Sequence, residues 1–251
     1  MIGVIGGVGP FAGLDLLKKI LEQTAAQTDQ DHLAVVTISQ PAPIADRTAF
    51  LLGETVLNPA WPILKQLAQL EKLGATVAGV PCNTAHAAPI RNVIEQELAV
   101  SGSQMRLLNM IEEVGFFLKH HYPVVQTAGL LSTTGTSFSH VYPQTLEPMG
   151  FKVIEAQDPA IKEMVHHAIY DKEYGIKARG YATERVRMDI LTAVRHLGKC
   201  GAEAIILGCT ELPLAIPERD IDGLPQIDST LALARALIGA ADPQKLKPWE
   251  G

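Results

Sequence analysis

Two cysteines stand at matching places in two similar segments of the chain. Cys82 follows Gly74 by eight residues, Cys209 follows Gly201 by eight, and each pair encloses a short apolar run. Each run is typical of a strand, and we expect a helix after each cysteine, where the N-terminal dipole favours a thiolate. Two thiols facing one cleft could remove a proton from one side of a stereocentre and return one to the other side. That chemistry is racemisation.

The matching segments belong to a longer internal repeat. Gly3 precedes Gly9 by six residues, and Gly129 precedes Gly135 by six. The offset between copies is 126 residues for these glycines and 127 for the cysteines, close to half of the 251-residue chain. We therefore interpret the chain as two similar halves with an active site at the seam between them. Cys200 has no counterpart in the first half, and we expect it to serve packing.

The first turn of the chain could bind an anion. Gly7-Val8-Gly9-Pro10-Phe11-Ala12 fits the relaxed dinucleotide pattern G-x-G-x-x-A, but the next strand ends in Ser39-Gln40-Pro41, without an acidic residue to hold a ribose. A nicotinamide cofactor is therefore the weaker interpretation. Backbone N–H groups of this turn, with hydroxyls of the equivalent turn at 132–136, could instead hold one carboxylate across the seam.

Four further polar side chains need an interpretation, and His86 and Glu211 each have two. His86 lies four residues after Cys82 and could polarise that thiol, or it could cap or pack the helix. Glu211 could accept a hydrogen bond from a substrate ammonium or from a thiol, or it could stabilise a helix start. Arg47 and Lys177 lie on polar connections, where residue type alone predicts solvated surface cations.

Gly and Pro residues that interrupt regular structure, together with the spacing of apolar residues, predict the helices and strands that hold these side chains. We expect a strand at the start of the chain, a strand before each of Cys82 and Cys209, and further strands at 33–38, 106–110, 128–131 and 152–155. We expect helices from 59 to 74, from 184 to 197 and after 229, and one that opens at Pro10. In that first helix, the apolar residues on one side are Phe11, Leu14, Leu17 and Leu21.

Strands that alternate with helices predict an α/β protein with parallel sheets flanked by helices. We assign residues 1–114 plus 228–251 to a first α/β domain and residues 115–227 to a second. In such sheets, ligands bind beyond the carboxyl ends of the strands. Both Cys82 and Cys209 are expected at that edge.

Composition argues against several classes of function. Apolar residues make up 47% and charged residues 19%, as in a folded globular protein. The net charge of −6, with no run of five like charges, argues against nucleic-acid and anionic-membrane partners. The start has no basic leader and no apolar run approaches the roughly 20 residues of a membrane span, so we expect a cytoplasmic protein. Three cysteines in no zinc-like spacing predict free thiols and no metal site.

At these positions the sequence resembles the aspartate/glutamate racemase superfamily, and within it the aspartate racemase branch. The resemblance covers essentially the whole chain. The segments that carry it are Ile5-Gly6-Gly7-Val8-Gly9-Pro10, Asp46-Arg47-Thr48, Pro81-Cys82-Asn83-Thr84-Ala85-His86, Leu131-Ser132-Thr133-Thr134-Gly135-Thr136, Ile176-Lys177-Ala178 and Leu207-Gly208-Cys209-Thr210-Glu211. Glutamate racemases have Asp-Ser in place of Gly6-Gly7 and His in place of Glu211, and they lack the Asp-Arg-Thr segment. Glutamate is thus the less expected substrate.

The resemblance implies two pseudo-symmetric Rossmann-like domains, a homodimer, and interconversion of L- and D-aspartate by a two-base mechanism without pyridoxal phosphate or another cofactor. It implies that Cys82 and Cys209 are the two bases and that Arg47 and Lys177 bind the side-chain carboxylate of a dicarboxylic amino acid. Val8 stands where the first loop most often has Met, which changes the pocket wall rather than the chemistry. The other expected substrate-binding residues are Gly7, Val8, Asn83, Thr84, Thr133, Thr136, Thr210 and Glu211.

Other functions of the same architecture stay open. The chain could be a glutamate or broad-specificity amino-acid racemase, or a decarboxylase, cis-trans isomerase or hydantoin racemase of the superfamily. It could also be a non-catalytic amino-acid-binding protein on the same fold. The Arg47 and Lys177 pair favours a dicarboxylic amino acid, and the presence of both Cys82 and Cys209 argues against the binding protein.

Overall fold

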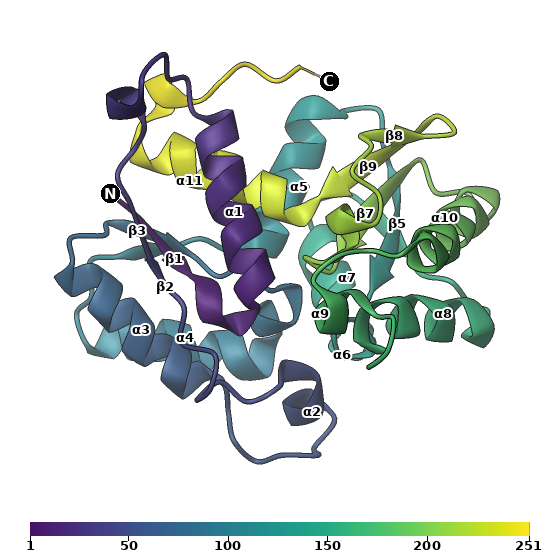
Figure 1. Ribbon diagram of the computed structural model, residues 1–251, viewed down its shortest axis with the longest axis horizontal. Helices are drawn as coiled ribbons and strands as arrows, with labels where there is room; N and C mark the ends of the chain where they lie inside the picture. Colours follow the sequence, from purple (N-terminus) through teal and green to yellow (C-terminus); the bar gives the residue numbers. More distant parts are fainter. Residues whose placement is uncertain (251) are drawn as a thin grey trace.

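Two α/β lobes lie side by side in the computed structural model, which describes residues 1–250 (Figure 1). The first sheet has the order β2-β1-β3-β4 and the second the order β6-β5-β7-β9-β8. All strand pairs are parallel except β8 with β9. The strands are β1 (Ile2–Ile5), β2 (Val35–Ile38), β3 (Val77–Gly79), β4 (Arg106–Leu107), β5 (Thr127–Ser132), β6 (Lys152–Ile154), β7 (Ala204–Gly208), β8 (Asp220–Ile221) and β9 (Leu224–Asp228). The predicted fold class is confirmed.

The two sheets repeat one topology. In each, the first strand in sequence lies between the second and the third, and a later strand, β4 in the first sheet and β9 in the second, pairs in parallel with the third. The strands β3 and β7 occupy equivalent places, and their sequences carry the matching Gly-Ala openings. The shared strand order confirms the internal repeat. It also places Cys82 and Cys209 beyond the carboxyl ends of equivalent strands.

Helices cover both sheets (Figure 1). The α-helices are α1 (Pro10–Gln23), α2 (Arg47–Leu51), α3 (Ala60–Lys72), α4 (Ala88–Val100), α5 (Met110–His121), α6 (Thr134–Phe138), α7 (Val141–Leu146), α8 (Pro159–Tyr170), α9 (Ile176–Arg179), α10 (Glu184–Lys199) and α11 (Ser229–Ala241). Short 3-10 turns are η1 (Gly6–Val8), η2 (Asp29–Asp31), η3 (Asn83–His86), η4 (Leu212–Leu214) and η5 (Pro243–Lys245). No helix in residues 1–250 combines the length and apolar character needed to cross a membrane.

Helix α1 turns a different face to the core from the one expected. Its buried residues are Ala12, Gly13, Leu16 and Ile20, whereas Phe11, Leu14 and Leu21 are exposed. The reason is the close approach of the helix to the turn after β1, where a Cβ on Gly13 would lie 2.5 Å from the Cα of Gly6. The helix therefore packs through its small residues.

The strand expected at 106–110 is also shorter than predicted. It ends at Leu107, because Asn109 caps the next helix by accepting a hydrogen bond from the Ile111 N–H at 3.1 Å. Helices α3 and α10 follow the prediction, and α10 buries the expected face of Val186, Ile190, Val194 and Leu197.

The last helix returns to the first lobe. Helix α11 begins directly after β9 of the second sheet, yet its main contacts are with α1 and α5 (Figure 1). Its buried residues Leu233 and Leu237 share one apolar cluster with Ile2 and Val4 of β1. Helix α11 therefore packs against β1 of the first sheet, and the assignment of residues 228–251 to the first domain stays a proposal.

Candidate active site

A narrow cavity lies between the two lobes at the carboxyl ends of β3 and β7. Its lining residues are Val8, Gly9, Arg47, Pro81, Cys82, Asn83 and Thr84 from the first lobe, and Thr133, Tyr170, Lys177, Gly208, Cys209, Thr210 and Glu211 from the second. Its volume is about 10 Å³, which is room for roughly one water molecule. An amino acid can enter only if the walls separate.

Two of the expected substrate-binding residues stand behind this lining. Gly7 packs against the backbone of Gln40, and a Cβ on Gly7 would lie 2.6 Å from the Gln40 nitrogen. Thr136 is buried and shares hydrogen bonds with Thr84 at 2.8 Å and with Thr133 at 3.2 Å. Both residues therefore shape the cavity through their neighbours.

Cys209 lies in an acidic and buried environment. Its thiol donates a hydrogen bond to Glu211 Oε2 at 3.0 Å. Burial, and next the charge of Glu211, raise the pKa of the Cys209 thiol well above its ordinary value. The expected helix after Cys209 is absent, since only the short turn η4 follows, so the expectation of a thiolate-favouring helix dipole is wrong at this position.

Glu211 and Lys177 form an ion pair beside this thiol. Lys177 Nζ donates to Glu211 Oε1 at 2.6 Å, and Thr210 Oγ1 donates to Oε2 at 3.1 Å. Burial alone would raise the pKa of Glu211, but the charge of Lys177 and these hydrogen bonds lower it. Burial alone would lower the pKa of Lys177, but the charge of Glu211 raises it. Both groups are therefore charged, and the expectation that Lys177 is a solvated surface cation is wrong.

Replacing Glu211 with Gln is expected to make Cys209 more reactive. The substitution removes the negative charge beside the thiol and leaves Lys177 in place, so the Cys209 pKa falls and more thiolate forms at a given pH. We expect alkylation of Cys209 by iodoacetamide at pH 8 to become about tenfold faster or more. Cys200 and Cys209 lie on one tryptic peptide, so peptide mass spectrometry is best done in a Cys200→Ser background.

The matched control for that measurement is Glu218→Gln, which removes a carboxylate paired with Arg187 on the surface. It should leave the labelling of Cys209 unchanged. A Glu211→Gln protein whose Cys209 labels no faster than in the parent would contradict the role assigned to this carboxylate.

Arg47 brings a buried positive charge to the opposite side of the cavity, near Cys82. It opens α2, where the Asp46 side chain caps the helix by accepting from the Ala49 N–H at 2.9 Å. Burial alone would lower the pKa of the guanidinium, but Cys82 and Asp46 raise it. The residue is 9% exposed, so here too the expectation of a solvated surface cation is wrong.

The guanidinium of Arg47 has an unused donor. Its Nη1 donates a long hydrogen bond to the Ala45 carbonyl at 3.4 Å, and its charge also interacts with the Cys82 sulfur. Its Nε is buried without a hydrogen-bond partner in residues 1–250. A buried, unpaired donor of this kind is suited to bind an anion.

A hydrogen-bond network joins the two lobes behind the cysteines. Tyr142 donates to Asn83 Oδ1 at 2.6 Å, and Asn83 Nδ2 donates to Ser229 Oγ at 3.2 Å. Ser229 donates in turn to the Leu207 carbonyl at 2.9 Å. The Asn83 amide thus fixes the loop after Cys82 relative to β7.

Tyr170 is a cavity residue that the sequence analysis did not identify. It is the last residue of α8. Its hydroxyl oxygen lies 3.4 Å from Thr48 Oγ1, and the centre of its ring lies 5.4 Å from Lys177 Nζ. Burial raises the pKa of Tyr170 to about 12, against the opposing charge of Lys177. No motif marks this residue, because it reaches the cavity only through the packing of α8 against the seam.

His86 supports the loop of Cys82 from behind. Its Nε2 donates to the Val80 carbonyl at 3.1 Å, and its Nδ1 accepts from Arg91 Nη1 at 3.3 Å. Burial, and next the charge of Arg91, lower the pKa of His86 to about 3. Of the two interpretations, packing therefore fits the observed contacts, because both ring nitrogens are engaged away from the thiol.

The lowered pKa of His86 predicts an acid-sensitive fold. Unfolded His86 takes up a proton below pH of about 6.5, whereas folded His86 stays neutral down to about 3. Its contribution to stability is therefore present above pH 6.5 and is lost as the pH falls. Between pH 5.5 and 4 we expect the unfolding free energy of the parent to fall more steeply than that of His86→Gln, by about 1.4 kcal/mol per pH unit. Urea denaturation at several pH values measures this difference; equal slopes in the two proteins would contradict it.

The third cysteine lies outside the cavity. Cys200 is exposed at the end of α10, so the expectation that it serves packing is wrong. All three cysteines are free. Within residues 1–250, no three His, Cys, Asp or Glu side chains are placed to hold a metal ion.

The cavity contains the two cysteines and the charged side chains expected for proton transfer at an amino acid. A model of a known protein family also matches the sequence. The sequence model described as Asp/Glu/Hydantoin racemase matches residues 5–237. The chain belongs to the Asp/Glu/Hydantoin racemase family. The predicted enzyme class, an amino-acid racemase, follows from this membership. The resemblance stated from the motifs is confirmed.

Other proteins similar to this member of the Asp/Glu/Hydantoin racemase family match it along most of their length. The broad specificity amino-acid racemase RacX of Bacillus subtilis is 26% identical, over 95% of this chain and 96% of that protein. The structure of Picrophilus torridus aspartate racemase superimposes with a TM-score of 0.77, at 28% identity over 96% of this chain and 93% of that one. An aspartate racemase homologue from Pyrococcus horikoshii superimposes with a TM-score of 0.73, at 25% identity over 96% and 98%.

Proposed function

We propose that this racemase interconverts L- and D-aspartate by using Cys82 and Cys209 as its two bases. The observation that carries this proposal is the opposite charge beside the two thiols of one cavity. Cys82 has the Arg47 guanidinium as its neighbour, and Cys209 has the Glu211 carboxylate. Positive charge favours a thiolate and negative charge favours a thiol. Cys209, whose thiol the carboxylate keeps protonated, therefore serves as the acid, and we assign the base to Cys82.

In the forward step the Cys82 thiolate removes the α-proton from one face of the substrate and becomes a thiol. The Cys209 thiol donates its proton to the opposite face and becomes a thiolate. The two thiols have then exchanged protonation states, and the reverse reaction or proton exchange with solvent restores the resting form. The Glu211 carboxylate disfavours the Cys209 thiolate and therefore favours the return to the resting form.

Separate groups are available for the two carboxylates of aspartate. The unpaired Nε donor of the buried Arg47 guanidinium supports binding of the side-chain carboxylate by a charge-assisted fork. Backbone N–H groups and hydroxyls of the cavity, from Thr84, Thr133 and Thr210, are suited to hold the α-carboxylate and to stabilise charge that develops on it. Lys177 is already paired with Glu211, so we assign it to the positioning of that carboxylate and of Cys209.

We also propose a cytoplasmic homodimer with no nucleic-acid, membrane or cofactor partner. The charge balance, the weak dinucleotide pattern and the resemblance to aspartate racemases support this. Light scattering on the purified protein measures its oligomeric state directly.

The deciding experiment is incubation of the protein with L-aspartate in deuterated water without added cofactor. Two-base racemisation predicts loss of the α-proton signal and appearance of D-aspartate, followed by NMR and chiral chromatography. A panel of L-amino acids in parallel defines the substrate. No exchange with any amino acid would contradict the proposal.

A broad-specificity amino-acid racemase is the second candidate. RacX, whose printed name describes that specificity, aligns with nearly the whole chain. One observation favours it as well: because Glu211 neutralises Lys177, Arg47 is the one cavity cation of the described residues without an ionic partner, and it could bind the α-carboxylate that all amino acids share. Comparable exchange rates for neutral and acidic amino acids would support this candidate.

A further inference from the structure

A second and larger cavity lies in the second lobe between α6 and α8. It has a volume of about 600 Å³, within the range of small-molecule sites. It opens at the carboxyl ends of β5 and β6, on the other side of α6 from the seam. Its lining residues are Leu130, Leu131, Ser132, Thr134, Ser137, Phe138, Glu155, Ala156, Pro159, Ile161, Lys162, Glu163, Val165, His166 and His167.

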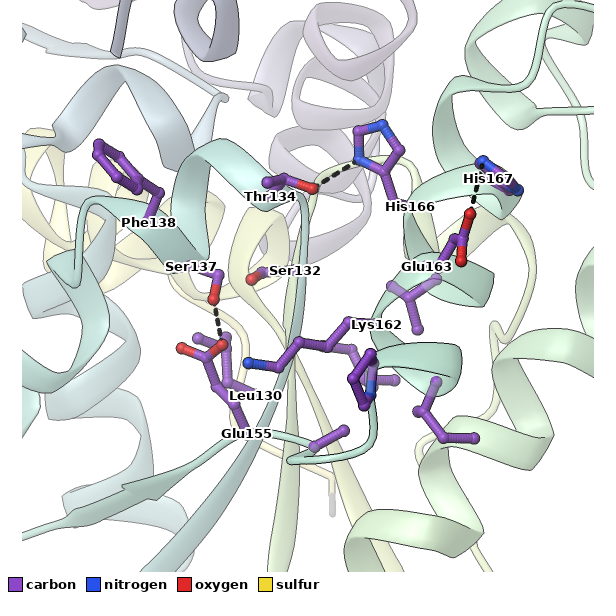
Figure 2. Close-up of a pocket in the computed structure, with 15 residues that line it drawn as sticks. Leu130, Ser132, Thr134, Ser137, Phe138, Glu155, Lys162, Glu163, His166 and His167 are labelled. Atoms are coloured by element: carbon purple, nitrogen blue, oxygen red, sulfur yellow. Dashed lines mark hydrogen bonds and ion pairs between the residues drawn. The ribbon is translucent and has the colours of Figure 1, made fainter. Parts of the chain in front are cut away.

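The lining separates into an apolar floor and a charged end. Buried Leu130, Leu131, Ile161 and Val165 belong to the floor. At the charged end, Figure 2 shows the Lys162 ammonium extending toward Glu155. No ion pair joins these two groups in residues 1–250, and Glu155 accepts instead from the Ser137 hydroxyl.

This arrangement matches the chemistry of one class of molecule. A ligand that carries an ammonium and a carboxylate close together could bind Glu155 with the first and Lys162 with the second. An apolar body attached to the same carbon would then cover the floor. These are the features of an α-amino acid with an apolar side chain.

Two elements connect this cavity with the active site. In α6, Thr134, Ser137 and Phe138 line the second cavity, while Thr136 bonds to Thr84 of the active-site cavity. A Cβ on Gly135 would lie 2.4 Å from Thr48 Oγ1, so α6 has no free space next to the residue after Arg47.

In α8, His166 lines the second cavity and stacks on the Tyr170 ring at 5.0 Å, with 22° between the planes. The same His166 shares a hydrogen bond with Thr134 at 3.0 Å (Figure 2). A ligand that moves α6 or His166 must therefore move active-site side chains.

We propose that the cavity between α6 and α8 binds an α-amino acid with an apolar side chain, and that its occupancy changes the rate of racemisation through α6 and Tyr170. The binding claim is independent of the proposed function. The claim about the rate of racemisation rests on the proposed function.

Titration calorimetry with L-leucine and with D-leucine tests binding. We expect saturable binding, and Lys162→Met and Glu155→Gln should each weaken it about tenfold or more. 4-Methylpentanoate, which lacks the ammonium, and 3-methylbutylamine, which lacks the carboxylate, should bind more weakly than leucine. Lys152→Met, a surface control at the opposite end of β6, should bind leucine like the parent.

Arg47→Ala separates the two cavities, since Arg47 lines the active-site cavity and not the second one. Leucine binding that survives in Arg47→Ala and is lost in Lys162→Met supports the second site. The reverse pattern would place leucine in the active site and overturn the proposal. So would no binding by the parent, or a dimer that dissociates in Lys162→Met, because a second copy would then cover the cavity.

Saturating leucine should change kcat/KM for aspartate at least twofold in the parent and leave it unchanged in Lys162→Met. Binding without that change in the parent would overturn the coupling through α6. If the parent racemises no amino acid, the proposed function fails while the calorimetric result still decides the site.

Discussion

Cys82→Ser and Cys209→Ser are each expected to abolish racemisation while the protein stays folded. A serine hydroxyl is far too weak an acid to replace either thiol as base or acid. The loss should reach or exceed the roughly 10⁴-fold upper range for one general acid or base. Serine is nearly isosteric with cysteine, so we expect both variants to fold. Circular dichroism and urea denaturation check this.

Isotope exchange gives this prediction a sharper form. In Cys209→Ser the remaining Cys82 thiolate can still reach the α-proton of one enantiomer, and in Cys82→Ser the remaining Cys209 can reach only the other. Any residual deuterium exchange should therefore be confined to one enantiomer in each variant, and to opposite ones. Exchange of the same enantiomer in both would contradict the two-base assignment. Cys200→Ser is the matched control and should keep full turnover, because that thiol is exposed at the end of α10.

The positions of the two cysteines could be predicted because they depend on local pattern and topology. An apolar run after Gly-Ala makes a buried strand, and equivalent strands of repeated parallel sheets end at equivalent edges. The repeat offset therefore predicted that Cys82 and Cys209 occupy equivalent positions. The structure places both in the lining of one cavity.

The charges around the cysteines could not be predicted in the same way. Lys177 of α9 reaches Glu211, which follows β7 and lies 34 residues away in sequence. The absence of a helix after Cys209 likewise depends on the chain leaving the cavity through η4 toward β8. Both features are tertiary, so sequence reasoning expected a helix-stabilised thiolate where the structure has a thiol bonded to a carboxylate.

The error in the predicted buried face of α1 has a related cause. Apolar spacing predicts which residues could be buried, but the distance of a helix from its sheet decides which ones are. Gly13 allows contact with Gly6, so small residues occupy that interface, and the larger Phe11 and Leu14 face outward. Tyr170 was missed for the same reason, since nothing local marks a residue that reaches the cavity through helix packing.

Arg47→Ala is expected to impair aspartate turnover severely. The guanidinium is buried beside Cys82 with an unused Nε donor, so a substrate carboxylate that binds there forms a buried charge pair. Truncating one partner of such a pair weakens transition-state binding by about 2 to 5 kcal/mol, a fall of about 30-fold to about 5,000-fold in kcat/KM. Arg179→Ala is the control, because Arg179 is exposed and bonds the Glu173 carbonyl outside the cavity.

Arg47→Lys should not restore aspartate turnover, because an ammonium is a point charge and cannot reproduce the planar two-bond fork. The substrate dependence of the loss then identifies which carboxylate Arg47 binds. If it binds the side-chain carboxylate, Arg47→Ala lowers kcat/KM for aspartate and changes that of neutral amino acids little. If it binds the α-carboxylate, acidic and neutral amino acids lose equally, which is the behaviour of a broad-specificity racemase. An unchanged kcat/KM for aspartate would remove Arg47 from substrate binding altogether, and with it the reason to prefer a dicarboxylic substrate.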